Sequence, residues 1–132
     1  MLNEAQHALE KAEDCLDDSA FNLSAGRTIV TVNRAYYAIY YCICCLLFTQ
    51  NVNTKTHKGA QQKFSELFVK TGIFPIITAK WVSDAFELRQ FGDYDLEATI
   101  PEADARLVLE QAQHFYNLVK DYFENLLRNQ NG

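Results

Sequence analysis

The chain has 132 residues, of which 48% are hydrophobic and 22% are charged, and this balance is typical of a soluble globular protein with one core. Its few Gly and Pro residues favour long helices over a β-sandwich, and its net charge of −5 argues against a general nucleic-acid coat protein and against DNA as a partner. Acidic residues near the start and the absence of a sufficiently long apolar run predict a cytoplasmic protein without a membrane span.

Two long helices are expected in the first part of the chain. Apolar residues spaced three and four apart predict a helix over 2–18, ended by Asp17-Asp18-Ser19. Residues 24–49 are apolar almost all round, and this run is far too long for a strand. We therefore expect it to be a central helix that neighbouring helices cover on most sides.

Two features of this apolar segment bear on chemistry. Its CxxC at Cys42–Cys45 has no second pair at metal-site spacing, so we interpret the cysteines as small core residues and expect no metal and no cofactor. Arg34 is costly in such surroundings unless it is paired or faces a wet groove. The residues alone leave open a buried ion pair with Asp93 or Asp95. They equally allow an Arg34 that binds a phosphate or nucleotide in a groove rimmed by Tyr36 and Tyr37.

A third helix is expected over 57–70, with Thr56 as its N-cap and Gly72 as its stop. His57 and Lys58 fall in its first turn, where free N–H groups and the helix dipole favour an anion. The simpler interpretation is an exposed helix start with basic neighbours.

The last two predicted helices cover 76–91 and the segment from a capping box at Thr99–Glu102 to Arg128, with 129–132 frayed. The prediction is therefore a single all-α domain over 1–132. It is an up-and-down antiparallel helical bundle of about five helices with a long apolar central helix.

The sequence ELRQFGDYD ends the fourth predicted helix. Arg89 and Asp93 are four residues apart and can pair across one turn, while Tyr94 would point away from Arg89 if the helix continued. Gly92 weakens the helix and would let Asp93 and Tyr94 turn back toward a groove. A salt bridge at a helix end and a functional site both fit this pattern. No Walker, HExxH or GxSxG motif is present, so a conventional hydrolase is unsupported.

Four segments in order resemble one known family: NRAYYAIYY, THKGA followed by Phe64, FVKTG and ELRQFGDYD. They are similar to the HEPN domain (higher eukaryotes and prokaryotes nucleotide-binding), in its small single-domain prokaryotic branch, over residues 2–127. The resemblance implies a helical homodimer, often encoded beside a minimal nucleotidyltransferase. Many members are metal-independent endoribonucleases with an Arg-x(4–6)-His motif, and some are the toxins of two-gene modules.

Arg89 matches the motif Arg, and Tyr94 stands where the shortest form of the motif would place His. The phenol of Tyr has an ordinary pKa near 10, against about 6.5 for His, so Tyr is a poor base at neutral pH. The leading hypothesis is a protein that binds a nucleotide or RNA phosphate and works with a nucleotidyltransferase in a toxin–antitoxin-like module. The residues assigned to binding are Arg34, Tyr37, His57, Lys58, Arg89 and Asp93. One alternative is an endoribonuclease toxin that uses Arg89 with Tyr94 or His57, and another is a non-catalytic interaction module.

Overall fold

The computed structural model describes residues 2–131, and all of its regular structure in that range is helical. The elements are listed in chain order: α1 (Leu2–Ser24), α2 (Thr28–Thr49), α3 (His57–Phe64), the π-helix η1 (Ser65–Val69), α4 (Ile76–Tyr94) and α5 (Glu102–Asn131). The all-α prediction is confirmed.

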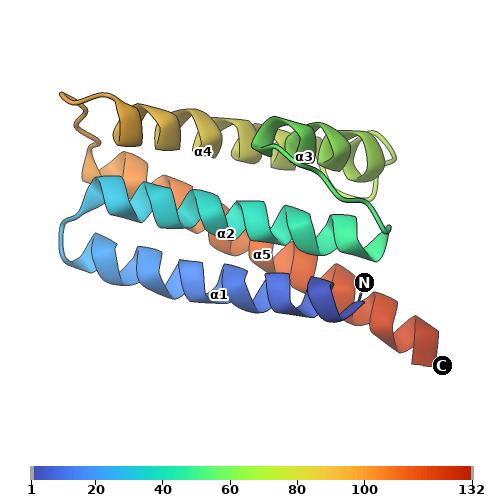
Figure 1. Ribbon diagram of the computed structural model, residues 1–132. Helices are drawn as coiled ribbons and strands as arrows, with labels where there is room; N and C mark the ends of the chain where they lie inside the picture. The colour runs from blue at the N-terminus through green and yellow to red at the C-terminus, as the bar shows by residue number, and fades with distance from the viewer. Residues whose placement is uncertain (1, 132) are drawn as a thin grey trace.

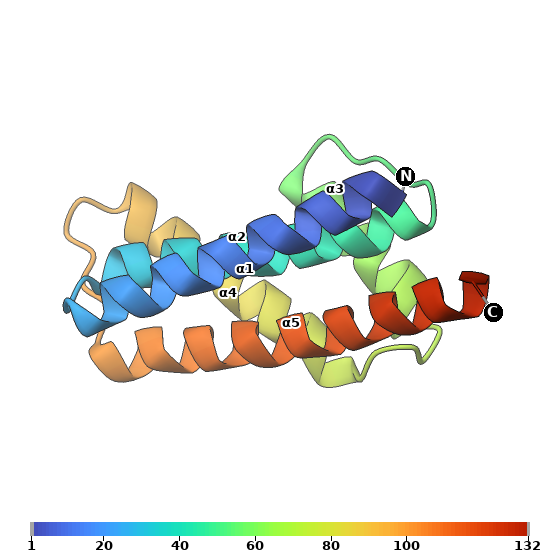
Figure 2. The same cartoon turned by 90° about the horizontal axis from the view of Figure 1, so that it is seen from below.

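The four long helices form an antiparallel bundle, in which α2 and α5 run one way and α1 and α4 run the other (Figure 1). The short α3 and η1 lie in the connection between α2 and α4, on the same side of α2 as α4 (Figures 1 and 2). This arrangement confirms the predicted up-and-down bundle.

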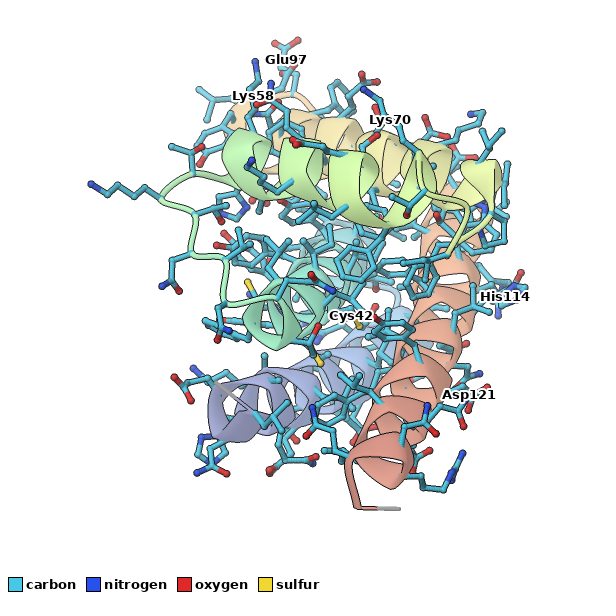
Figure 3. All side chains as sticks on the ribbon, turned by 90° about the vertical axis from the view of Figure 1, so that its right-hand side faces the viewer. Cys42, Lys58, Lys70, Glu97, His114 and Asp121 are labelled. Carbon is cyan, nitrogen blue, oxygen red and sulfur yellow. The ribbon has the colours of Figure 1, made fainter. Side chains whose placement is uncertain are left out.

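Helix α2 is the central element, since α1, α3, α4 and α5 all contact it. Its length and mean hydropathy of 1.3 would also suit a membrane span, but 56% of that apolar segment is buried against the other helices. The aromatic and aliphatic side chains of α2 therefore have protein neighbours, as predicted for the core helix. Cys42 and Cys45 lie in this core and Cys15 packs there from α1, as Figure 3 shows for Cys42.

Several helices end or begin at residues other than those predicted. Helix α1 continues six residues beyond the predicted end, because Ser19 is buried and its hydroxyl donates to the Thr31 carbonyl at 2.7 Å. Helix α5 runs to Asn131, and Gly132 lies outside the described residues. The fraying of residues 129–132 stays a prediction. Helix α5 begins at Glu102, with the Pro101 carbonyl accepting the first bonds, so the predicted capping box at Thr99 is wrong.

The helix that carries His57 begins where predicted. The Thr56 hydroxyl accepts a hydrogen bond from the Gly59 N–H at 2.9 Å, which confirms the N-cap. Gly72 has φ +82°, which confirms it as a stop after this segment. The π-helical turn between them was not predicted. It is a wider turn that inserts one extra residue into the helical register.

Candidate functional site

Arg89, on the last turns of α4, is the centre of the site. It is only 7% exposed, and its guanidinium carbon lies between 5.0 and 5.9 Å from the centres of four aromatic rings. Tyr36 and Tyr37 come from α2, and Phe86 and Tyr94 come from α4. Cation–π contacts of this kind hold a cation in place without using its hydrogen-bond donors.

The donors of Arg89 are incompletely used. Its nearest carboxylate is that of Asp93, at an Nη1–Oδ2 distance of 3.7 Å, which is too long for a hydrogen bond. Its Nε is buried and has no hydrogen-bond partner among residues 2–131. The predicted pairing of Arg89 with Asp93 is therefore present but weak, and the guanidinium keeps capacity for an anionic ligand.

Asn33 connects Arg34 to this pair. Its amide nitrogen donates to Asp93 Oδ2 at 2.9 Å, and its carbonyl oxygen accepts from Arg34 Nε and Nη2 at 3.0 and 2.8 Å. The predicted direct ion pair of Arg34 with Asp93 is thus replaced by a contact through Asn33. Arg34 also lies over the Tyr37 ring, with its guanidinium carbon 5.2 Å from the ring centre, so it is near the site and only half-buried.

His57 approaches the same place from the start of α3. Its Nδ1 is 2.6 Å from the Tyr36 hydroxyl, and its ring stacks on Tyr40 with centres 4.3 Å apart. Burial, and then the positive charge of Arg89, lower the pKa of His57 below its ordinary value. The pKa of Tyr36 is raised, mainly by burial, so its hydroxyl keeps its proton at neutral pH. The neutral imidazole of His57 and the guanidinium of Arg89 are thus surrounded by the same aromatic rings.

Tyr94 lies on the outer edge of the site. Helix α4 continues through Gly92 to Tyr94, so the predicted turn at Gly92 is wrong. A side chain at Gly92 would meet Ile100 at 3.1 Å, and the glycine therefore permits close packing. The expectation that Tyr94 would then point away from Arg89 is also wrong, since its ring contacts the guanidinium while remaining 74% exposed.

Two predicted polar residues are not drawn into the site. Lys58 is exposed and lines a groove between α3 and α4 together with Gln62 and Ser65. Asp95 is exposed beyond the end of α4, where its carboxylate accepts from the Glu97 N–H at 2.9 Å. His7 and His114 are exposed, and Figure 3 shows His114 on the outer side of α5. The His114 ring packs against Trp81, with ring centres 4.9 Å apart.

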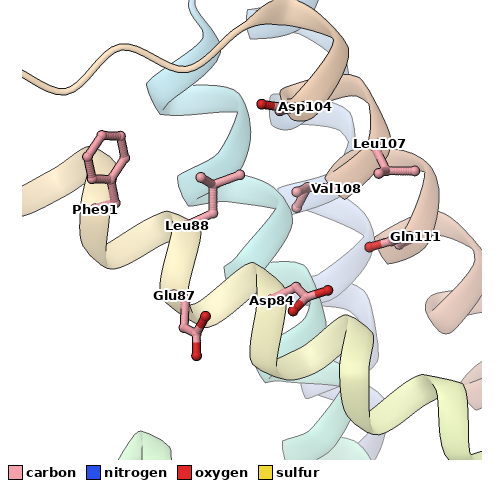
Figure 4. A pocket seen from close by; sticks show the side chains of 8 residues that line it. All are labelled: Asp84, Glu87, Leu88, Phe91, Asp104, Leu107, Val108 and Gln111. Atoms are coloured by element: carbon pink, nitrogen blue, oxygen red, sulfur yellow. The ribbon is translucent and has the colours of Figure 1, made fainter.

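A separate groove of about 380 Å³ lies between α4 and α5 (Figure 4). Leu88 and Phe91 of α4 face Leu107 and Val108 of α5 across it. Its carboxylates, Asp84, Glu87 and Asp104, would repel a phosphate group. An anionic ligand is therefore favoured at Arg89 and disfavoured here. No group of three or more His, Cys, Asp or Glu side chains suited to a metal ion occurs within residues 2–131.

The sequence matches the model of the HEPN domain over residues 5–122, which include the whole Arg89 site. The chain belongs to the HEPN family. This chain is 31% identical to "Putative toxin MJ0142" of Methanocaldococcus jannaschii, over 97% of its own length and 88% of that protein. It is also 30% identical to a UPF0332 protein of Thermotoga maritima, over 96% and 99% of the two chains. A third relative, "Putative toxin MJ0605" of Methanocaldococcus jannaschii, is 30% identical over 94% and 92%.

Two polar residues of the site, Asn33 and Gln61, were not predicted from the sequence. Asn33 is adjacent to Arg34 and could have been noticed as a polar residue inside an apolar helix. Gln61, on α3, has a buried side-chain nitrogen without a hydrogen-bond partner in the described part of the chain, and its side chain interacts with the Tyr36 hydroxyl. Its place one turn after His57 was the available signal, because residues four apart share a helix face.

Proposed function

We propose that this HEPN domain binds RNA through a phosphate group at Arg89 and acts as the toxin-like member of a two-gene module. The observation that carries the proposal is the buried guanidinium of Arg89, which has a weak ion pair and an Nε without a hydrogen-bond partner in the described range 2–131. A buried donor without an acceptor costs free energy, and a phosphate oxygen is an acceptor that would recover it. The word toxin in the names of two relatives agrees with this role.

The binding test is fluorescence anisotropy with a labelled single-stranded RNA of nine nucleotides at low salt. The variant Arg89→Met lacks the charged group that is proposed to hydrogen-bond the phosphate. It should therefore bind the RNA about tenfold or more weakly than the wild type does. Arg106→Met is the matched control, because Arg106 is exposed on α5 and pairs with Glu102 at 2.8 Å. Equal affinities of wild type and Arg89→Met would refute the proposal.

A metal-independent endoribonuclease is the second candidate, and the proximity of His57 to Arg89 favours it. In this mechanism, neutral His57 takes the proton of a ribose 2′-hydroxyl as the 2′-oxygen attacks phosphorus, and Arg89 stabilises the charge on the phosphate. The bond from phosphorus to the 5′-oxygen breaks, and this oxygen takes a proton from water, which gives a 2′,3′-cyclic phosphate and a 5′-hydroxyl end. The lowered pKa of His57 suits it to act as the base.

Cleavage is tested with RNA in the presence of EDTA, and with the all-deoxy strand as a substrate that lacks the nucleophile. Arg89→Met and His57→Gln should each lower the cleavage rate about a hundredfold or more, whereas Tyr94→Phe should keep it. Loss of cleavage in Tyr94→Phe with retention in His57→Gln would assign the proton transfer to Tyr94. That result would refute the role of His57.

We also propose a homodimer and a minimal nucleotidyltransferase partner. Support for the homodimer comes from the exposed apolar side chains of Phe91 and Tyr94 at the end of α4 and of the fully exposed Leu96 just beyond it. The Tyr94 ring among them contacts Arg89. Sedimentation velocity should give twice the monomer mass, and Leu96→Asp should give the monomer. The partner is tested by gel filtration with the nucleotidyltransferase encoded by a neighbouring gene, and separate elution of the two proteins would contradict it.

A further inference from the structure

A row of aromatic rings on α2 leads away from the Arg89 site. Tyr37, beside Arg89, is followed by Tyr40 at 6.3 Å between ring centres, and Tyr40 is followed by Tyr41 at 5.7 Å. All three rings are partly exposed, unlike the buried Tyr36. The row therefore presents a continuous aromatic surface that begins where the phosphate is proposed to bind.

Two cations lie over this row. The guanidinium carbon of Arg34 is 5.2 Å from the centre of the Tyr37 ring, and Nζ of Lys11 is 5.4 Å from the centre of the Tyr41 ring. Lys11 comes from α1, so positive charge is present at both ends of the row. This local arrangement contrasts with the net charge of −5 of the whole chain and suits a polyanion with aromatic groups.

The far end of the row opens into a groove of about 340 Å³ between α1 and α2. Its lining includes Tyr40, Tyr41, Phe48, Lys11, His7 and Glu4. Glu4 is an acidic group on this groove, and Lys11 is a cation on it. A volume of this size is in the range of small-molecule sites and accommodates planar groups.

We propose that this aromatic groove, from Tyr37 to Phe48, binds the unpaired bases of a single-stranded RNA whose phosphate is held at Arg89. The inference rests on the proposed function and specifies its substrate. Bases stack on aromatic side chains and the backbone follows the cations, which is how single strands are bound with little sequence preference. The bases of a duplex are stacked on one another and unavailable to these rings.

The experiment compares two labelled RNAs by anisotropy, a dinucleotide that can fill the Arg89 site alone and a nine-nucleotide single strand. The wild type should bind the longer strand at least tenfold more tightly. Tyr41→Leu should weaken the longer strand about tenfold, since one base loses its stacking partner, and should leave the dinucleotide unchanged. Tyr41→Phe, which keeps the ring, should bind both RNAs as the wild type does.

Lys11→Gln should weaken binding of the longer strand and reduce its dependence on salt. Lys120→Gln, on α5 in the groove with Glu13 and Glu124, is the matched control and should have no effect. If Tyr41→Leu binds the longer strand like the wild type while Arg89→Met does not, the inference fails and the proposed function stands. If Tyr41→Leu weakens binding and Arg89→Met does not, the phosphate site is wrong and the groove is retained. Unchanged RNA binding by Tyr41→Leu together with dissociation of a dimer would make the groove an interface between copies and would overturn the inference.

Discussion

At the scale of single residues, the site joins two groups that are far apart in the sequence. Arg89 was identifiable from its motif and His57 from its place in a basic helix start. Their shared surround, Tyr36 and Phe86, depends on how α3 packs against α2 and α4. No local pattern encodes that packing, so the sequence left both His57 and Tyr94 open as candidates for the proton transfer.

The lowered pKa of His57 gives a prediction about pH. Burial and Arg89 both disfavour the imidazolium in the folded protein, so the unfolded chain binds a proton more readily, at its ordinary pKa of about 6.5. The contribution of His57 to stability is therefore present above that pH and is lost as the pH falls through the lower, folded-state pKa. An NMR titration should place the His57 pKa below 6.5 and show it rising in Arg89→Met. A wild-type value at or above 6.5 would contradict the arrangement.

At the scale of helices, the N-cap of α3 and the stop after η1 were predictable because their signals are local, whereas the capping box predicted at Thr99 does not form. Thr56 and Gly72 behave as expected. The ends of α1 and α4 were not predictable in the same way. The buried hydroxyl of Ser19 and the close packing at Gly92 extend these helices through tertiary contacts that periodicity does not register.

Thr56→Ala tests the cap that positions His57. Loss of the hydroxyl acceptor leaves the Gly59 N–H without its partner, so the variant should lose about 1 kcal/mol of unfolding free energy in urea. Thr56→Ser keeps the acceptor and should remain within a few tenths of a kcal/mol of the wild type. Equal loss in both variants would show that the cap does not determine the effect.

Substitutions of Gly92 test the end of α4. Leu at this position must displace Ile100 and Ile29, and the free energy of unfolding should fall by about 1–3 kcal/mol. The Cβ of Ala would meet the flexible end of Ile100 at 3.1 Å and Ile29 at ordinary contact distances of 3.4 and 3.7 Å. The helix preference of Ala over Gly, about 1 kcal/mol, offsets the close contact with Ile100. We expect Gly92→Ala to unfold close to the wild type in a thermal scan. A stable Gly92→Leu variant would contradict the close packing.

At the scale of the whole molecule, the bundle followed from periodicity and from one apolar helix that had to be central. The grooves did not, because each is formed by side chains from two helices whose relative rotation is fixed by packing. The π-helical turn was equally hidden, since one extra residue in a helix leaves no mark in the composition of residues 65–69.

The core position of the cysteines gives a prediction for the intact protein. Burial raises the pKa of Cys15 and Cys42 and raises the pKa of Cys45 to about 12, so these thiols are neither accessible nor ionised. Cys44 is half-buried, with a pKa that is also raised by burial. Mass spectrometry after iodoacetamide at pH 8 should show at most one labelled cysteine, Cys44, in the native protein and four after unfolding. Native labelling of Cys42 would contradict the bundle.

The Nε of Arg89, which no residue between Leu2 and Asn131 hydrogen-bonds, has a consequence for the energetics of the ligand-free protein. Burying the Arg89 guanidinium costs desolvation free energy, and its weak ion pair with Asp93 offsets only part of that cost. An apolar residue at this position would avoid the cost. Arg89→Met, which still leaves Asp93 its bond from Asn33, is therefore expected to melt no lower than the wild type. A ligand that hydrogen-bonds the guanidinium should remove this cost, and the melting temperature should then rise with the ligand concentration. The residue that enables this protein to bind a phosphate therefore lowers the stability of its ligand-free form.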